Sequence, residues 1–115
     1  IRRWLSENFI KKNPDIYKKI YSILEKNNRT DFLKCYKIFV NYIDDDSILK
    51  KIKVNTLIIT GENDVGSTPK MSRNLSKMIQ GSKFIEIKEG KHLCGIECAN
   101  DVNIVFKKFI DKNND

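Results

Sequence analysis

Apolar residues recur every three or four positions through the first half of the chain, a spacing that predicts amphipathic helices. One helix is predicted from Pro14, because proline is favoured in a first helical turn, and a second from Thr30, a residue suited to cap a helix. Shorter helical pieces are expected within residues 2–9 and 44–52. Residues 1–52 are therefore predicted to form a helical block. The strongest apolar stripe, on the second helix, is expected to be core rather than ligand pocket: Phe32, Cys35, Tyr36, Phe39, Val40 and Ile43.

The pattern changes in the second half of the chain. Residues 54–60 are mainly consecutive apolar side chains, as is typical of a strand buried on both faces of a parallel sheet, and Gly61 ends this predicted strand. Thr68 then provides an N-cap and Pro69 the first residue of a helix. A second strand is predicted at residues 83–87. A last helix is indicated by apolar residues at helical spacing: Val102, Val105, Phe106, Phe109 and Ile110.

The order strand, helix, strand, helix predicts an α/β fold in which two parallel strands are joined by a crossover helix. Asp64 follows the first strand and His92 follows the second. Because the carboxyl ends of parallel strands meet at one edge of a sheet, the two side chains are expected to come within hydrogen-bond reach. A carboxylate in that position fixes the orientation of the imidazole and stabilises it once it is protonated. This pair predicts two members of a catalytic triad.

Three segments resemble the C-terminal part of α/β-hydrolase-fold enzymes: "IKVNTLIITGENDVGSTP", "GSKFIEIKEGKHLCGIE" and "VNIVFKKFI". They cover about half of the chain. In that family a Gly-x-x-Asp turn carries the triad acid and a later loop carries the triad histidine. The resemblance therefore implies that Asp64 is the acid and His92 the general base, and it places Glu97 where such enzymes have a structural glutamate.

The same resemblance implies a division of the chain. Residues 1–52 are similar to the helical lid that is inserted between core strands in this fold, and residues 53–115 to the C-terminal part of the core. The segment "RRWLSENF" and the pair Cys35-Tyr36 resemble the 3-oxoadipate enol-lactone hydrolase branch. The implied activity is hydrolysis of a small ester, lactone or thioester through a Ser-His-Asp triad, with a small-molecule substrate and no cofactor.

The sequence departs from the family pattern at three points. Asn55 stands where the family usually has proline, and Lys91 stands where a glycine usually precedes the histidine. The nucleophile motif Gly-x-Ser-x-Gly is absent from the 115 residues. The chain is therefore expected to be a C-terminal piece whose nucleophile lies before Ile1, and the 115 residues alone are expected not to hydrolyse esters.

Two alternatives remain open. The first is a hydrolase of the same fold with an aspartate nucleophile, such as a dehalogenase or an epoxide hydrolase, in which His92 activates water. The second is a non-catalytic interaction module in which Asp64 is an ordinary turn aspartate. Either residue alone would favour an ordinary structural role, whereas their joint placement after consecutive strands favours catalysis.

The net charge of +7 raises the question of nucleic-acid binding, but the lysines are spread along the chain without a basic stripe or a binding motif. Nucleic acid is therefore not predicted as a partner. No apolar run approaches the roughly 18–20 residues needed to cross a bilayer, so a membrane span is not predicted either. The oligomeric state is left open.

The three cysteines, Cys35, Cys94 and Cys98, form no even-numbered framework, which favours a reducing compartment and predicts a cytoplasmic protein. His92, Cys94 and Cys98 lack the paired spacing of a zinc site. No metal is predicted, and the cysteines are expected to serve as packing residues.

Overall fold

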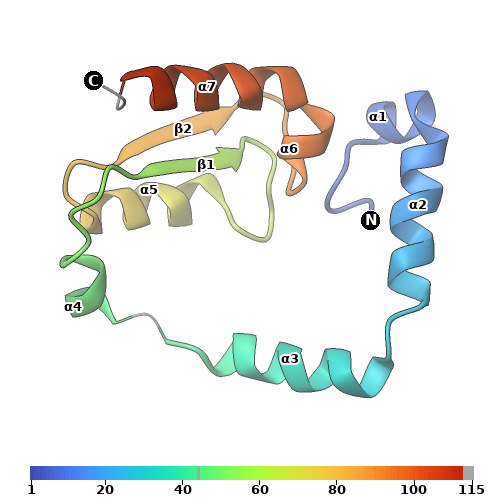
Figure 1. Ribbon diagram of the computed structural model, residues 1–115. Helices are drawn as coiled ribbons and strands as arrows, with labels where there is room; N and C mark the ends of the chain where they lie inside the picture. The colour runs from blue at the N-terminus through green and yellow to red at the C-terminus, as the bar shows by residue number, and fades with distance from the viewer. Residues whose placement is uncertain (44, 113–115) are drawn as a thin grey trace.

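The computed structural model describes residues 1–43 and 45–112 of the chain (Figure 1). Residue 44, in the predicted connector, and residues 113–115, at the end of the predicted core segment, lie outside the described residues. The elements, in chain order, are α1 (Glu7–Lys12), α2 (Pro14–Glu25), α3 (Arg29–Asn41), α4 (Asp46–Leu49), β1 (Leu57–Gly61), α5 (Pro69–Met78), β2 (Lys83–Ile87), α6 (Cys94–Glu97) and α7 (Ala99–Lys112).

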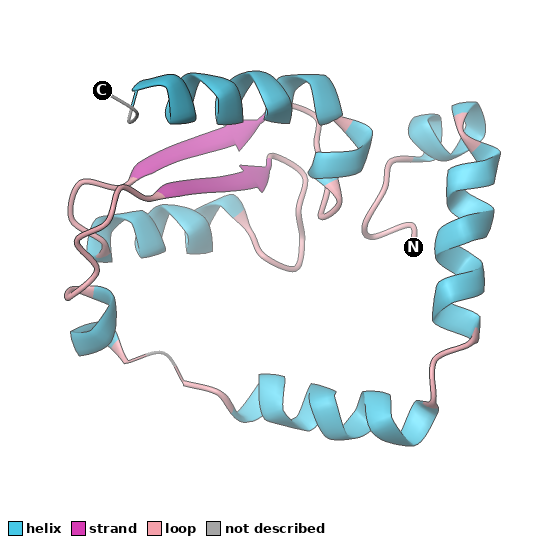
Figure 2. Cartoon of the chain, in the orientation of Figure 1, coloured by secondary structure: helices cyan, strands magenta, loops and turns pink. Residues whose placement is uncertain are grey.

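Strands β1 and β2 form a parallel pair, in register from Leu57 opposite Lys83 to Gly61 opposite Ile87. Helix α5 packs on one face of this pair and α7 on the other (Figure 2). A buried cluster of Ile87, Cys94 and Val102 joins β2 to α6 and α7. Parallel strands covered by helices on both faces confirm the predicted α/β fold class.

Strand β1 has the uncharged composition of a strand inside a sheet, although only one of its edges is paired in the described residues. The Thr56 carbonyl accepts the N–H of Lys83 at 2.9 Å, so the backbone N–H and C=O groups of Thr56 and of every second residue after it face β2. Because backbone groups alternate sides along a strand, those of Leu57 and Ile59 face the opposite edge, where the described residues supply no further strand. Strand β1 carries no charged side chain, whereas β2 carries Lys83 and Glu86, as edge strands commonly do.

Helix α3 begins earlier than its sequence pattern predicts. Its N-cap is Asn28, and the predicted cap, Thr30, lies inside the first turn. The Asn28 side-chain oxygen accepts the backbone N–H groups of Thr30 and Asp31, at 2.9 and 3.2 Å. The prediction of Thr30 as the cap is therefore wrong, because an asparagine two residues earlier satisfies the exposed donors of the helix start.

Other element boundaries also differ from the predictions. The helical piece expected within residues 2–9 begins only at Glu7, where Ser6 caps it, and it continues to Lys12. The first strand is shorter than predicted, since it begins at Leu57 and includes Gly61. The single turn of α6 was not predicted, because a four-residue helix containing a glycine has no periodic signal.

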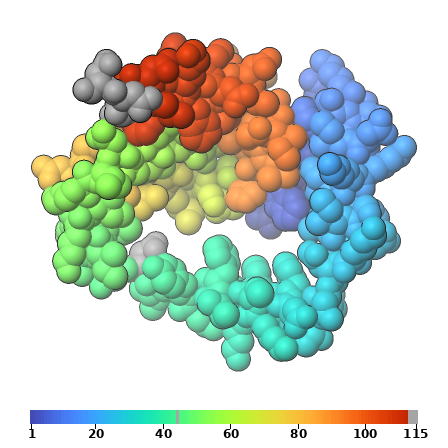
Figure 3. Space-filling view, viewed as in Figure 1, coloured from blue at the N-terminus to red at the C-terminus, as the bar shows by residue number. Residues whose placement is uncertain are grey.

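The apolar stripe of α3 is not core within the described part of the chain. Helices α2 and α3 lie apart from the strands (Figure 1), and Figure 3 shows an opening between α3 and the half of the molecule that holds the sheet. Tyr36 is 52% exposed, Phe39 75% and Ile43 87%. The expectation that this stripe forms core is therefore wrong.

None of the described helices is long and apolar enough to cross a membrane.

Candidate active site

Asp64 lies at the end of a tight turn that leaves β1. Its backbone N–H donates to the Gly61 carbonyl at 3.1 Å, and the residue is 6% exposed. Its Oδ1 accepts the backbone N–H groups of Gly66 and Ser67, at 2.8 and 3.0 Å. One carboxylate oxygen is thus committed to the loop that contains it, so the second oxygen has a fixed direction.

The second oxygen, Oδ2, lies 2.8 Å from Nδ1 of His92, which follows β2. The sequence-predicted pair is therefore in direct contact. The His92 side chain is 43% exposed, and its ring centroid lies 6.5 Å from that of Trp4. Because Nδ1 is held by the carboxylate, Nε2 is the ring nitrogen that remains to exchange a proton with a reacting group.

Two opposing effects act on the pKa of Asp64. Burial alone would raise it, but hydrogen bonds from His92, Gly66 and Ser67, together with the charge of His92, lower it below the ordinary value of 3.8. The net effect is a lowered pKa, because the carboxylate accepts three hydrogen bonds. Asp64 is therefore ionised at neutral pH, the state in which it can stabilise an imidazolium.

Gly61 allows the loop that carries Asp64 and the loop that carries His92 to approach closely. A Cβ atom on Gly61 would overlap the backbone carbonyls of Gly90 and Lys91, which directly precede His92. The Asn63 N–H donates to the Gly90 carbonyl at 2.8 Å and closes the same contact. The absence of a side chain at position 61 therefore sets the distance between the loops of the acid and the base.

Glu97 joins the histidine loop to the start of the chain. Its Oε1 accepts the backbone N–H of Lys91, and its Oε2 accepts that of Ser6 at 2.8 Å. Glu97 therefore has a structural role, as the resemblance implies for this position. These two bonds hold the residue before His92 and the N-cap of α1 on one carboxylate.

Two further bonds fasten residues 2–6 to this loop. The Leu93 N–H donates to the Trp4 carbonyl at 2.9 Å, and the Lys91 ammonium donates to the Arg2 carbonyl at 2.8 Å. Between them Leu5 is fully buried. We call these contacts, together with those of Glu97, the terminal clamp. No sequence pattern predicted the clamp, because the first residues and the histidine loop that it joins are about 90 residues apart.

No protein-family model and no curated protein matches the sequence. The fold does match solved structures. The enol-lactonase from Burkholderia xenovorans LB400 aligns over 96% of this chain and 42% of its own, with a TM-score of 0.87 and 22% identity. The bromoperoxidase from Bacillus anthracis aligns over 60% of this chain and 25% of its own, with a TM-score of 0.57 and 27% identity. This chain has part of an α/β-hydrolase fold.

The fold-level resemblance expected from the sequence is confirmed. The chain spans about two fifths of the length of the enol-lactonase and a quarter of that of the bromoperoxidase.

A pocket of about 340 Å³ opens beside the Asp64–His92 pair in this α/β-hydrolase-fold segment. Trp4 from the start of the chain lines it, together with Tyr36 and Phe39 from α3. Sequence reasoning did not place these residues near the acid and base. The only sequence signal for Tyr36 and Phe39 was the apolar stripe of the helix, and such a stripe does not show whether its side chains lie in a core or line a pocket.

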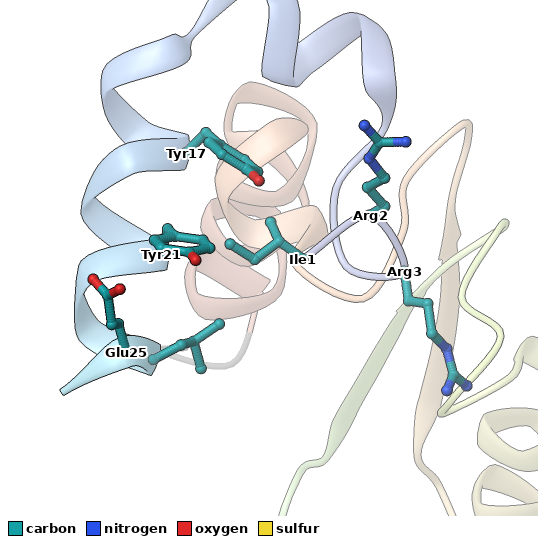
Figure 4. A pocket seen from close by; sticks show the side chains of 7 residues that line it. Ile1, Arg2, Arg3, Tyr17, Tyr21 and Glu25 are labelled. Carbon is teal, nitrogen blue, oxygen red and sulfur yellow. The ribbon is translucent and has the colours of Figure 1, made fainter. Parts of the chain in front are cut away.

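A second cavity, of about 600 Å³, lies between the first residues and α2. In Figure 4 the side chain of Ile1 lies beside Tyr17 and Tyr21 of that helix. The lining of this second cavity includes neither Asp64 nor His92, so the pocket of about 340 Å³ beside that pair is the better candidate for proton-transfer chemistry.

Two cysteines and Glu62 near the pair have structural positions. Cys94 is buried, and burial raises the pKa of its thiol, which disfavours the reactive thiolate. Burial raises the pKa of Cys98 in the same way. Glu62 accepts the backbone N–H of Glu89 at 2.8 Å. Among residues 1–43 and 45–112, no group of three or more His, Cys, Asp or Glu side chains is arranged to hold a metal ion.

Proposed function

We propose that this chain supplies the acid and the general base of a hydrolase triad, with Asp64 as the acid and His92 as the base. The observation that carries the proposal is the 2.8 Å contact between Asp64 Oδ2 and His92 Nδ1, in a loop where Asp64 is buried and further bonded. An incidental aspartate and histidine would not require such a contact, so the geometry favours this function over a non-catalytic module.

The chemistry follows from the two ring nitrogens. Asp64 keeps a proton on Nδ1, so the lone pair of Nε2 is directed away from the carboxylate. Nε2 then removes the proton of a nucleophilic hydroxyl as the hydroxyl attacks the substrate carbonyl, and Asp64 stabilises the imidazolium that results. In the second half of the reaction, His92 returns the proton to the leaving group.

The substrate class is a small ester, lactone or thioester. The volume of the pocket beside His92 lies at the low end of the range for small-molecule sites, which supports a small substrate. The structural similarity to an enol-lactonase supports a lactone or a related ester. In this proposal, residues 1–52 act as a lid and residues 53–115 as part of the core.

The nucleophile is proposed to lie outside the 115 residues, because no Gly-x-Ser-x-Gly motif occurs in them. The uncharged outer edge of β1 supports this, since it offers unpaired backbone groups at Leu57 and Ile59 to a further parallel strand. Such a strand would end at the same sheet edge as Asp64 and could place a nucleophile loop beside His92.

A labelling experiment tests the proposal. The native polypeptide that contains this chain is treated with a fluorophosphonate, which reacts with activated serines, and the labelled peptide is identified by mass spectrometry. We expect labelling of a serine outside the 115 residues and its loss in His92→Ala. Labelling that persists unchanged in His92→Ala would refute the role of His92, and p-nitrophenyl acetate turnover by the 115 residues alone would refute an outside nucleophile.

A further inference from the structure

The pocket beside the Asp64–His92 pair is assembled from separate parts of the chain. The first residues contribute Trp4, α3 contributes Tyr36 and Phe39, and the region from the acid loop to the start of α5 contributes Val65 and Met71. Three of these five side chains are aromatic and the other two are apolar. The site therefore places an apolar lining next to the groups that would move a proton.

The aromatic side chains of α3 form a row on the helix surface. The rings of Phe32 and Tyr36 are stacked, with centroids 5.8 Å apart and planes inclined by 18°. Tyr36 and Phe39 follow at 6.1 Å with a 35° inclination. The exposed fractions of Tyr36 and Phe39 show that much of this aromatic surface is not covered by the described chain. Surface of this kind next to an acid-base pair is suited to the apolar part of a ligand.

The charges of the site restrict the ligand further. The Asp64 carboxylate already accepts hydrogen bonds from His92, Gly66 and Ser67, so it has little capacity left to bind a cationic ligand. Arg3, the basic side chain among the described lining residues, also disfavours a cation. A volume of about 340 Å³ accommodates a ring with a short substituent.

We propose that this pocket binds substrates that carry a flat aromatic ring on one side of the scissile ester, with the ring packed among Trp4, Tyr36 and Phe39. The assignment of the ligand as an ester rests on the proposed hydrolase function. Recognition of the ring depends only on the pocket, because aromatic rings gain from offset or edge-to-face contacts with one another beyond the burial of their surface.

The test uses Trp4, the single tryptophan of the sequence, as a fluorescence reporter. The 115-residue chain is titrated with acetanilide, an amide analogue of a phenyl ester that resists hydrolysis, and separately with N-cyclohexylacetamide, which has a ring of similar size that is not flat. We expect saturable changes in Trp4 emission, with acetanilide bound about tenfold more tightly. Equal dissociation constants, or no saturable response to acetanilide, would overturn the proposal.

Variants locate the binding site. We expect Phe39→Ala to weaken acetanilide binding about tenfold, and Phe39→Leu, which keeps apolar bulk without the ring, to weaken it severalfold. The matched control is Phe106→Ala, which removes a partly exposed phenylalanine of α7 that does not line the pocket. If Phe106→Ala weakens binding as much as Phe39→Ala, the assignment fails. Circular dichroism verifies the fold of each variant, and Phe39→Leu provides the result if Phe39→Ala does not fold.

The two proposals can fail independently. Fluorophosphonate labelling that depends on His92, combined with no preference for acetanilide, would leave the hydrolase function standing and remove the aromatic substrate class. Preferential binding of acetanilide without labelling that depends on His92 would leave an aromatic-binding pocket without the triad.

Discussion

Asp64 contacts His92 through one carboxylate oxygen and holds its own loop through the other. Oδ2 lies 2.8 Å from Nδ1 of His92, while Oδ1 accepts the N–H groups of Gly66 and Ser67. The two oxygens are therefore not interchangeable. Because two backbone donors fix Oδ1, any group that replaces Oδ2 must face the imidazole.

This asymmetry predicts the effect of Asp64→Asn on the imidazole. The amide oxygen should stay with the two backbone N–H donors, which leaves the NH₂ group facing Nδ1 and favours the tautomer protonated at Nε2. We expect nitrogen NMR of neutral His92, the one histidine of the sequence, to show Nδ1–H in the wild type and Nε2–H in the variant. In the proposed hydrolase, kcat should fall by about 10⁴-fold. A variant that keeps Nδ1–H would contradict the geometry.

The lowered pKa of Asp64 predicts a pH dependence of stability. A carboxyl group whose pKa is lower in the folded than in the unfolded state stabilises the fold above its unfolded value, and this contribution is lost as pH falls through the folded pKa. The advantage of wild type over Asp64→Asn in free energy of unfolding should therefore shrink as the pH falls below 3.8. Urea denaturation between pH 7 and pH 3 measures it, and a difference independent of pH would refute the prediction.

Gly61→Ala is expected to separate the acid and base loops. The added Cβ would overlap the carbonyls of Gly90 and Lys91, which are backbone atoms and cannot rotate away. We expect a loss of about 1–3 kcal/mol in the free energy of unfolding, together with a changed chemical shift of His92. The matched control is Gly95→Ala in α6, where an added Cβ meets no atom within 4 Å. That variant should be neutral or stabilising by up to about 1 kcal/mol, and equal losses in both would contradict the close approach.

Glu97→Ala tests the terminal clamp. The change removes the acceptor of the Lys91 and Ser6 N–H groups, so the free energy of unfolding should fall by about 1–3 kcal/mol. Glu97→Gln keeps one acceptor oxygen and should lose less. Glu25→Ala, at an exposed position of α2, serves as control and should change stability by less than about 0.5 kcal/mol. Chemical denaturation distinguishes these outcomes, and a Glu97→Ala variant as stable as the control would mean that the clamp does not hold the loop.

The part of the site that could be predicted from the sequence is the part built by local patterns. Apolar runs and glycines identified both strands, and parallel topology then placed Asp64 and His92 at one edge. The inference needed no long-range information, because a strand, a crossover helix and a second strand define their own geometry.

The family resemblance implied a structural glutamate at Glu97, but the pairing of Glu97 with Ser6 and the contribution of Trp4 could not be predicted from residue patterns. Each depends on a pairing between the first residues and the histidine loop, and such pairings leave no periodicity in the sequence. The role of the α3 stripe was misjudged for a related reason. Periodicity shows which side chains share a helix face, but the surface opposite Phe39 is set by the path of the whole chain.

The terminal clamp also has a consequence for the order of folding. Its bonds join residues 91 and 89 positions apart in the sequence, Ser6 with Glu97 and Arg2 with Lys91. Closing so long a loop costs more chain entropy than forming the neighbouring strand pair, so the clamp should form after β1 and β2 have paired. Pulse-labelling hydrogen exchange would show protection of the Ser6 amide later than that of the Ile85 amide, which faces β1, if this order is right. The loop that carries His92 would then reach its final position only in the last folding step.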